Sequence, residues 1–282
     1  MFFRRYPHVK LYFFGHDYKY AAEQILLTMF PTERPEYPSG KPEGDRMELK
    51  LSRGGQYITA TCALHRGDEV WHGRAAVRAE RLTDELLTDR YCQRLIKNAV
   101  YRAALASGVR RPAWGALTGV RPTKLATAAL LEGKSEQEVD KMLRKEFYVT
   151  TPRRKMCIEA ANQTLAAMKN LAPRDLSVYI GIPFCPTRCA YCSFVSQSIE
   201  KFGDLLAPYL DVLIREIEYT GKKLAESGWH IRTLYMGGGT PTTLSSPQMA
   251  RLLQAVQDNF DLSRCLEFTV EGGRPDTLDA EK

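Results

Sequence analysis

Three closely spaced cysteines are the residues of this chain whose type and spacing best indicate chemistry. Cys185, Cys189 and Cys192 lie in the segment CPTRCAYC, which follows the apolar run LSVYIGI. A structural zinc site normally has four ligands in a closed tetrahedron, and this segment supplies three. A disulfide framework is also disfavoured, because the chain has seven cysteines and is large enough to fold without such crosslinks.

A 4Fe-4S cluster suits the trio better, because cysteine thiolates are its usual ligands. Such a cluster normally has four thiolates, so three would leave one iron with a position for an exchangeable ligand. The remaining candidates for a fourth zinc ligand, His230 and Cys265, are predicted at the wrong end of a strand or within one. We interpret the scattered Cys62, Cys92, Cys157 and Cys265 as small buried residues.

Two further motifs also follow predicted strands. The segment GGGTP, Gly237 to Pro241, comes directly after the strand pattern IRTLYM, and Glu271 comes directly after LEFTV. Glycines have no Cβ and let the backbone approach a ligand closely, although the same residues also suit a plain tight turn. Since the carboxyl ends of parallel strands open onto one face, we expect the cysteines, the glycines and Glu271 to converge there.

The elements that must position these motifs alternate regularly after Pro173. Strand, helix, strand, helix and strand follow one another, and Ser246 with Pro247 opens the second helix. This alternation is typical of a parallel α/β barrel or a doubly wound sheet. We therefore predict an α/β fold, in which a domain of residues 1–172 precedes a domain of residues 173–282.

Residues 1–172 have the pattern of an α+β domain, in which turn signals separate an antiparallel meander of strands. The predicted strands are residues 8–14, 47–52, 56–65 and 69–77, with a Pro- and Gly-rich loop at 31–45. The predicted helices are residues 18–30 and 84–106, followed by a helical pattern from Val120 to Asn170 that is broken at 132–135 and 149–155.

The composition indicates a globular chain, because 44% of its 282 residues are hydrophobic and 26% are charged. No run approaches the roughly 18 to 20 apolar residues that span a bilayer, and the N-terminus lacks a secretory signal, so we expect a cytoplasmic protein without a membrane partner. Residues 1–172 contain 29 Lys and Arg against 19 Asp and Glu, whereas residues 173–282 contain 11 against 14. Such a basic domain attracts nucleic acid, an anionic small molecule or an acidic partner.

The motifs together resemble a known superfamily. The C-x3-C-x2-C spacing, with Tyr191 beside the last cysteine, resembles the radical S-adenosylmethionine (SAM) superfamily. The runs SVYIGIPFCPTRCAYCSF and YMGGGTPTTL resemble its oxygen-independent coproporphyrinogen III oxidase (dehydrogenase) group. The basic domain with LTGVRPTKL, joined to TVEGGRPDT, is similar to the HemZ-type branch of that group.

This resemblance implies a fold, two cofactors and their ligands. Residues 173–282 would be the first half of a partial (β/α)6 TIM-like barrel. Cys185, Cys189 and Cys192 would hold the 4Fe-4S cluster, and its open iron would bind the amino and carboxylate groups of SAM. The expected SAM-binding residues are Tyr179, Tyr191, Gly237, Gly238, Gly239, Thr240 and Glu271.

The implied reaction is an oxidative decarboxylation, in which a 5'-deoxyadenosyl radical abstracts hydrogen from substrate propionates, carbon dioxide leaves and vinyl groups form. The implied partners are a tetrapyrrole substrate and a reductant such as flavodoxin or ferredoxin; no residue is assigned as catalytic. Two positions depart from the group, because Phe194 replaces a further cysteine and Gly181 replaces a histidine. Relatives with Phe after the cysteines include haem-binding chaperones of the same fold.

Two other functions remain open from the sequence. A haem-trafficking protein would keep the barrel and lose turnover. A radical SAM enzyme that modifies RNA would use the Lys and Arg of the first domain for phosphate contacts. We interpret Arg110, Arg111, Arg121 and Lys124 as a solvated basic face rather than as partners of substrate carboxylates.

The sequence stops at DTLDAEK, where a third helix is expected to begin. The barrel of the superfamily has about six strands, so roughly three more strand–helix units are expected in a full-length protein. A parallel sheet that ended at the third strand would leave backbone groups unpaired. We therefore expect the chain to be a truncated, N-terminal part of a longer protein, and to be inactive or poorly stable by itself.

Overall fold

The computed structural model describes residues 7–119 and 121–282, and the chain divides into two compact units. The first unit is Met1–Ala167 and the second is Met168–Lys282. The first mixes helices with a largely antiparallel sheet, and the second alternates strands and helices around a parallel sheet, so the predicted α/β class is confirmed. The domain boundary predicted between residues 172 and 173 stays a prediction.

A five-stranded sheet in the order β2-β1-β3-β4-β5 forms the base of the first unit. β3, β4 and β5 pair as the predicted antiparallel meander, whereas β1 pairs in parallel with β2 and β3. The segment 31–45 was predicted to be all loop, and this is wrong at β2, where an edge position tolerates Pro35 without a backbone donor. The strands are β1 His8–Phe14, β2 Arg34–Glu36, β3 Arg46–Arg53, β4 Tyr57–Arg66 and β5 Glu69–Arg78.

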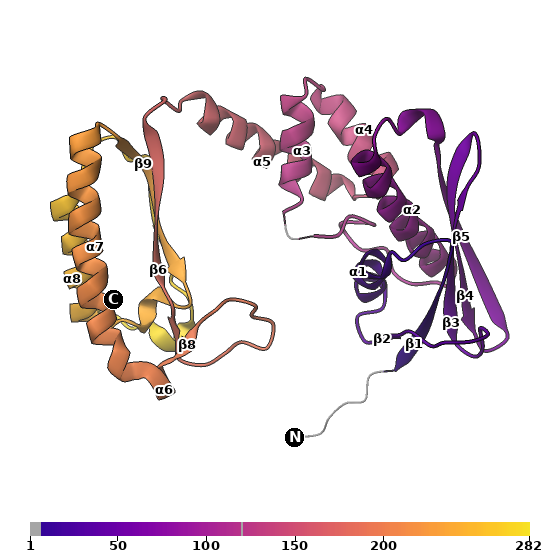
Figure 1. Cartoon of the computed structure of the whole chain (residues 1–282), viewed down its shortest axis with the longest axis horizontal. Helices are drawn as coiled ribbons and strands as arrows, with labels where there is room; N and C mark the ends of the chain where they lie inside the picture. Colours follow the sequence, from indigo (N-terminus) through magenta and orange to yellow (C-terminus); the bar gives the residue numbers. More distant parts are fainter. Residues whose placement is uncertain (1–6, 120) are drawn as a thin grey trace. The chain divides into compact units, whose positions relative to one another are not determined.

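Two helices cover one face of this sheet (Figure 1). The second of them, α2, packs on β4 and β5 and also contacts α1. Alternate strand residues such as Leu49 and Leu64 are buried together with Ile96 of α2, so the period of two along the strands defines the core face. The helices are α1 Lys19–Met29 and α2 Glu85–Ala106.

Three more helices follow and share a core of their own, which contains Ala126, Val139, Leu143 and Cys157. The break predicted at 132–135 is confirmed, since it lies between α3 and α4. The break predicted at 149–155 is confirmed only at its start, because α4 ends at Phe147 and α5 already begins at Thr151. The predicted start of the helical pattern, Val120, lies outside the described residues. The helices are α3 Thr123–Leu131, α4 Glu136–Phe147 and α5 Thr151–Lys169.

The second unit is built on a parallel sheet in the order β10-β9-β6, so strands that follow one another along the chain are neighbours (Figure 1). Ile182, Leu234 and Met236 are buried against Leu210 of α7 and Val256 of α8. Both helices therefore cover the same face of the sheet. The elements are β6 Asp175–Ile182, α7 Leu206–Ser227, β9 His230–Gly238, α8 Ser246–Asn259 and β10 Glu267–Val270.

A short parallel ladder closes the loop that carries the cysteines. Phe184 pairs with Gln197 and Cys185 with Ser198. Cys185 is therefore held on a strand, whereas the other two cysteines lie in the loop between the paired segments. The remaining elements are β7 Phe184–Cys185, β8 Gln197–Ser198, α6 Ile199–Phe202 and the 3-10 turns η1 Ala79–Arg81, η2 Gly203–Leu205, η3 Pro241–Thr243 and η4 Pro275–Thr277.

Candidate active site

The three cysteines of the predicted cluster site are half-buried and lie on one loop. The backbone N–H of Cys192 donates to the carbonyl of Cys189 at 3.0 Å, which forms a tight turn between them. Within residues 7–119 and 121–282, no three His, Cys, Asp or Glu side chains are gathered closely enough to form a metal centre. The role of Cys185, Cys189 and Cys192 as cluster ligands therefore stays a prediction.

The glycine loop, Gly237 to Pro241, packs directly on Cys185, the first of the three cysteines. The hydroxyl of the buried Thr240 lies 3.5 Å from Cys185 Sγ, and a Cβ on Gly239 would lie 2.9 Å from the same sulfur. The backbone N–H groups of Gly239 and Thr240 donate to the carbonyls of Ile182 and Phe184, both at 2.8 Å. These two N–H groups are thus used within the fold, and a ligand at this loop would have to donate hydrogen bonds, as an ammonium group does.

Glu271 directly follows β10, and its carboxylate lies next to Gly237 of the glycine loop. A Cβ on Gly237 would lie 2.8 Å from Tyr235 Cε1 and 3.0 Å from Glu271 Oε2, so the glycine leaves room for both side chains. Glu271 Oε1 accepts a hydrogen bond from the hydroxyl of Tyr235 at 2.5 Å, and this bond raises the pKa of Tyr235. The carboxylate is therefore oriented by a neighbouring side chain.

Tyr235 also stacks on Tyr179, with ring centroids 5.9 Å apart and an angle of 10° between the rings. The two residues are paired in register across β6 and β9, on the face that α7 and α8 leave uncovered. Tyr179 was predicted as a SAM-binding residue and Tyr235 was missed. The signal that identifies Tyr235 is the period of two along a strand, because it precedes Gly237 by two positions and shares its face.

Tyr191 and Arg274 lie beside the cysteine loop. Tyr191 is 90% exposed, and a hydrogen bond to the Cys189 sulfur raises the pKa of its hydroxyl. Arg274 donates to Thr187 Oγ1 at 2.5 Å, lies 4.0 Å from Cys189 Sγ and is paired with Asp276 at 2.7 Å. Arg274 was not predicted as a site residue, although it stands three residues after Glu271 in the segment EGGRPDT.

A small apolar cavity of about 290 Å³ opens next to these groups. Its wall contains Tyr179, Gly238 and Gly239, and also Phe194 and Gly181, the two positions that depart from the resembled group. The hydroxyl of Tyr209 donates to the carbonyl of Gly181 at 2.6 Å and fixes this part of the wall. Both departures therefore shape the surface around the predicted SAM-binding residues.

The structure thus brings the cysteine loop, the glycine loop and the segment from Glu271 to Arg274 together at the carboxyl ends of β6, β9 and β10. The basic residues singled out in the sequence are exposed and all belong to the first unit. They are Arg110, Arg111, Arg121 and Lys124. Every helix in the described part of the chain is too short or too polar to cross a bilayer.

No protein-family model matches the chain. The oxygen-independent coproporphyrinogen-III oxidase-like protein HemZ of Bacillus subtilis is 38% identical over 172 residues, which are 60% of this chain and 34% of that protein. The oxygen-independent coproporphyrinogen III oxidase of Escherichia coli is 34% identical over 38% of this chain and 23% of its own length. Heme chaperone HemW of Lactococcus lactis is 39% identical over 36% of this chain and 25% of its own length.

A solved structure, coproporphyrinogen III oxidase (HemN) from Escherichia coli, described as a radical SAM enzyme, is 32% identical over 39% of this chain and 24% of that chain, with a TM-score of 0.31. The chain thus spans about a third or less of the length of these relatives. The match to HemZ is longer than the whole of Met168–Lys282, so it extends into the first unit. These sequence similarities confirm the resemblance that the motifs predicted: the chain is similar to the oxygen-independent coproporphyrinogen III oxidases and their HemZ-like relatives.

Proposed function

We propose that this chain carries the cofactor-binding part of a radical SAM oxidoreductase that decarboxylates the propionates of a tetrapyrrole. The observation that carries the proposal is the convergence of three motifs at the carboxyl ends of neighbouring parallel strands. Thr240 contacts Cys185, and Arg274 lies against the cysteine loop. Active sites of parallel α/β proteins are built at this edge.

The residues present fit both cofactors. Cys185, Cys189 and Cys192 would hold a 4Fe-4S cluster, which when bound supplies the electron that cleaves the sulfonium bond of SAM. Gly239 leaves space beside Cys185, because a Cβ there would lie 2.9 Å from the sulfur. Glu271 would accept hydrogen bonds from the ammonium or a ribose hydroxyl of SAM, and a charged acceptor strengthens such bonds.

The other predicted SAM-binding residues have roles that follow from their positions. Gly237, Gly238, Gly239 and Thr240 would offer backbone carbonyls to the ammonium group. Tyr179 and the exposed Tyr191 would exclude water from the bound cofactors, because each has an aromatic ring beside the loop.

In the proposed reaction each propionate side chain loses one hydrogen atom, carbon dioxide and one electron, and becomes a vinyl group. SAM would supply the 5'-deoxyadenosyl group that takes up this hydrogen, and the electron would pass to an acceptor outside this chain. A reductant such as flavodoxin or ferredoxin would supply the electron for the cluster, and we propose a cytoplasmic location. Since the relatives are longer than this chain, the activity of a whole protein of this kind is itself part of the proposal.

The test begins with anaerobic reconstitution of the chain with ferrous iron and sulfide. About four irons per chain are expected, with loss of the cluster absorbance when any one of Cys185, Cys189 and Cys192 is replaced by Ala. Replacing Cys62, Cys92, Cys157 or Cys265 should leave the cluster in place. SAM should then change the electron paramagnetic resonance spectrum of the reduced cluster. A full cluster in the triple Ala variant would rule out this site.

A second candidate function is haem binding without turnover, which two observations favour. Phe194 lines the apolar cavity where the resembled enzymes have a further cysteine, and the relatives include heme chaperones. Product analysis separates the two functions: protein with SAM, a reductant and coproporphyrinogen III should form vinyl products if the first is right. Stoichiometric haem binding with no product would favour the second.

A further inference from the structure

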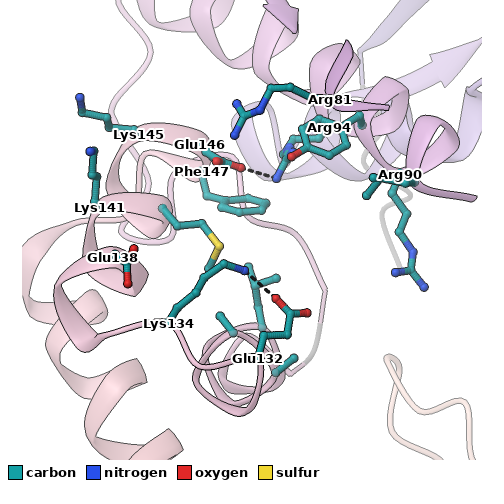
Figure 2. A pocket seen from close by; sticks show the side chains of 16 residues that line it. Arg81, Arg90, Arg94, Glu132, Lys134, Glu138, Lys141, Lys145, Glu146 and Phe147 are labelled. Carbon is teal, nitrogen blue, oxygen red and sulfur yellow. Dashed lines mark hydrogen bonds and ion pairs between the residues drawn. The ribbon is translucent and has the colours of Figure 1, made fainter. Parts of the chain in front are cut away.

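A cavity of about 820 Å³ in the first unit lies between the start of α2 and the helices α3 and α4. Pockets of roughly 300 to 1,000 Å³ are typical for small-molecule ligands. Figure 2 shows its two walls: Arg81, Arg90 and Arg94 on one side, and Lys134, Lys141 and Lys145 on the other. Positive side chains therefore lie on both sides of the cavity.

The carboxylates in this wall are ion-paired with only two of its six cations. Glu146 is paired with Arg94 at 2.5 Å, and Glu132 with Lys134 at 2.6 Å (Figure 2). Glu138 accepts hydrogen bonds from Ser135 in a capping box, which lowers the pKa of its carboxyl. Within the described residues, no carboxylate oxygen lies within 4.0 Å of the remaining cations. These are Arg81, Arg90, Lys141 and Lys145.

The interior of the cavity is apolar. Leu87, Tyr91, Leu125, Met142 and Phe147 line it, together with small alanines. The guanidinium carbon of Arg94 lies 3.9 Å from the centroid of the Tyr91 ring and 5.2 Å from that of Phe147. These aromatic rings already contact a cation, so they are poorly placed to stack nucleic acid bases, whereas the aliphatic side chains remain as an apolar floor.

A second cavity, of about 390 Å³, adjoins the first and shares Leu125, Ala128 and Phe147 with it. Its wall contains Arg121 and Lys124, which the sequence analysis interpreted as a solvated basic face. Arg121 and Lys124 thus border an apolar cavity. The two neighbouring cavities together have an apolar lining with positive side chains around it.

We propose that this paired cavity binds a large apolar molecule that carries several carboxylates, of the class of a porphyrin tetracarboxylate. An apolar floor buries the body of such a molecule, and unpaired Arg and Lys side chains at the rim meet carboxylates spread around its edge. The choice of a tetrapyrrole within this class rests on the proposed function. The inference adds a tetrapyrrole-binding site in the first unit, built from other residues than those of the cysteine and glycine loops.

The test is fluorescence titration of the whole chain, without cluster or SAM, with coproporphyrin III. The expected result is saturable binding of about one porphyrin per chain. The variant Arg81→Gln, Lys141→Gln and Lys145→Gln should bind about tenfold more weakly, because three exposed ion pairs are lost. The matched variant Lys50→Gln, Arg53→Gln and Arg74→Gln removes three exposed cations from β3 and β5 and should bind within about twofold of the parent. Circular dichroism should show that both variants are folded.

Coproporphyrin III tetramethyl ester has the same ring without free carboxylates and should bind at least about tenfold more weakly. Equal weakening by the two variants, equal binding of the ester, or no porphyrin binding would overturn the inference. A single-stranded RNA that binds in place of the porphyrin, with loss of binding in the first variant, would overturn it as well. Because the titration needs no cluster, cluster and SAM binding without porphyrin binding would sink this inference alone. Porphyrin binding by a chain that assembles no cluster on anaerobic reconstitution would sink the proposed function alone.

Discussion

The uncovered faces of the two sheets differ sharply, although in each sheet two helices cover the opposite face. In the first sheet, Lys50, Thr61 and Arg74 lie side by side across β3, β4 and β5. In the second, the corresponding row across β6, β9 and β10 is Tyr179, Tyr235 and Thr269. The first row is an ordinary solvated surface, whereas the second exposes stacked aromatic rings.

This contrast indicates where a ligand is expected. Tyr179 is 62% exposed and Tyr235 is 37% exposed, and exposed apolar surface next to a carboxylate is typical of a binding site. Glu271 lies at the end of this row, bonded to Tyr235. The cysteines follow the same division, because the three in the first unit are buried and the four in the second are half-buried.

Thiol reactivity should show the largest difference between the units. Burial raises the pKa of Cys62 to about 12 and also raises the pKa values of Cys92 and Cys157. Since the thiolate is the reactive form, iodoacetamide at about pH 8 should modify the cysteines of the second unit at least ~100-fold faster in the native, metal-free chain. Peptide mass spectrometry measures the rates. In urea all seven cysteines should react alike, and equal rates in the native chain would remove the contrast.

The packing of α2 on the first sheet gives the next largest effect. A Cβ on Gly73 would lie 1.9 Å from the carbonyl oxygen of Ala99, so Gly73→Ala must displace the helix. We expect a loss of about 2 kcal/mol in the free energy of unfolding, measured by urea denaturation. A Cβ on Gly55 would have no atom within 4 Å, and Gly55→Ala should leave stability nearly unchanged. Equal losses in both variants would contradict this packing argument.

Glu271→Gln should weaken SAM binding about tenfold, because the carboxylate would lose its charge-assisted hydrogen bond to the ammonium or ribose group. The affinity is measured by equilibrium dialysis with the reconstituted cluster. The matched control is Glu267→Gln on the same strand, whose side chain contacts Thr269. An unchanged affinity in Glu271→Gln would remove Glu271 from the site.

Tyr235→Phe should have the smallest effect, a roughly threefold loss of SAM affinity, because it removes one hydrogen bond to Glu271 and keeps the stacked ring. Tyr219→Phe on α7 removes an exposed hydroxyl elsewhere and serves as the control. If the two variants bind SAM equally well, the exposed row on the second sheet has no part in orienting Glu271.

Much of the fold and of the candidate site could be predicted, because the signals were local. The apolar run before Cys185, the glycines at the end of β9 and the turn signals between β3, β4 and β5 each depend on neighbouring residues. Strand ends and motif spacing follow from such patterns. The short edge strand β2 escaped prediction, because its Pro-rich segment has a loop composition and becomes a strand through pairing with β1.

The order of the elements, the three-cysteine spacing and the resemblance to known proteins depend on contiguous residues, so they could be recognised without coordinates. Contacts between side chains far apart along the chain depended on the folded structure. Tyr235 reaches Glu271 across 36 residues, and Arg274 reaches Thr187 across 87. The grouping of the basic residues also depended on the folded structure, because the packing of α2, α3 and α4 brings cations that are far apart in the sequence around one apolar cavity. Such contacts are set by strand register and helix packing, which depend on the whole core rather than on any one segment.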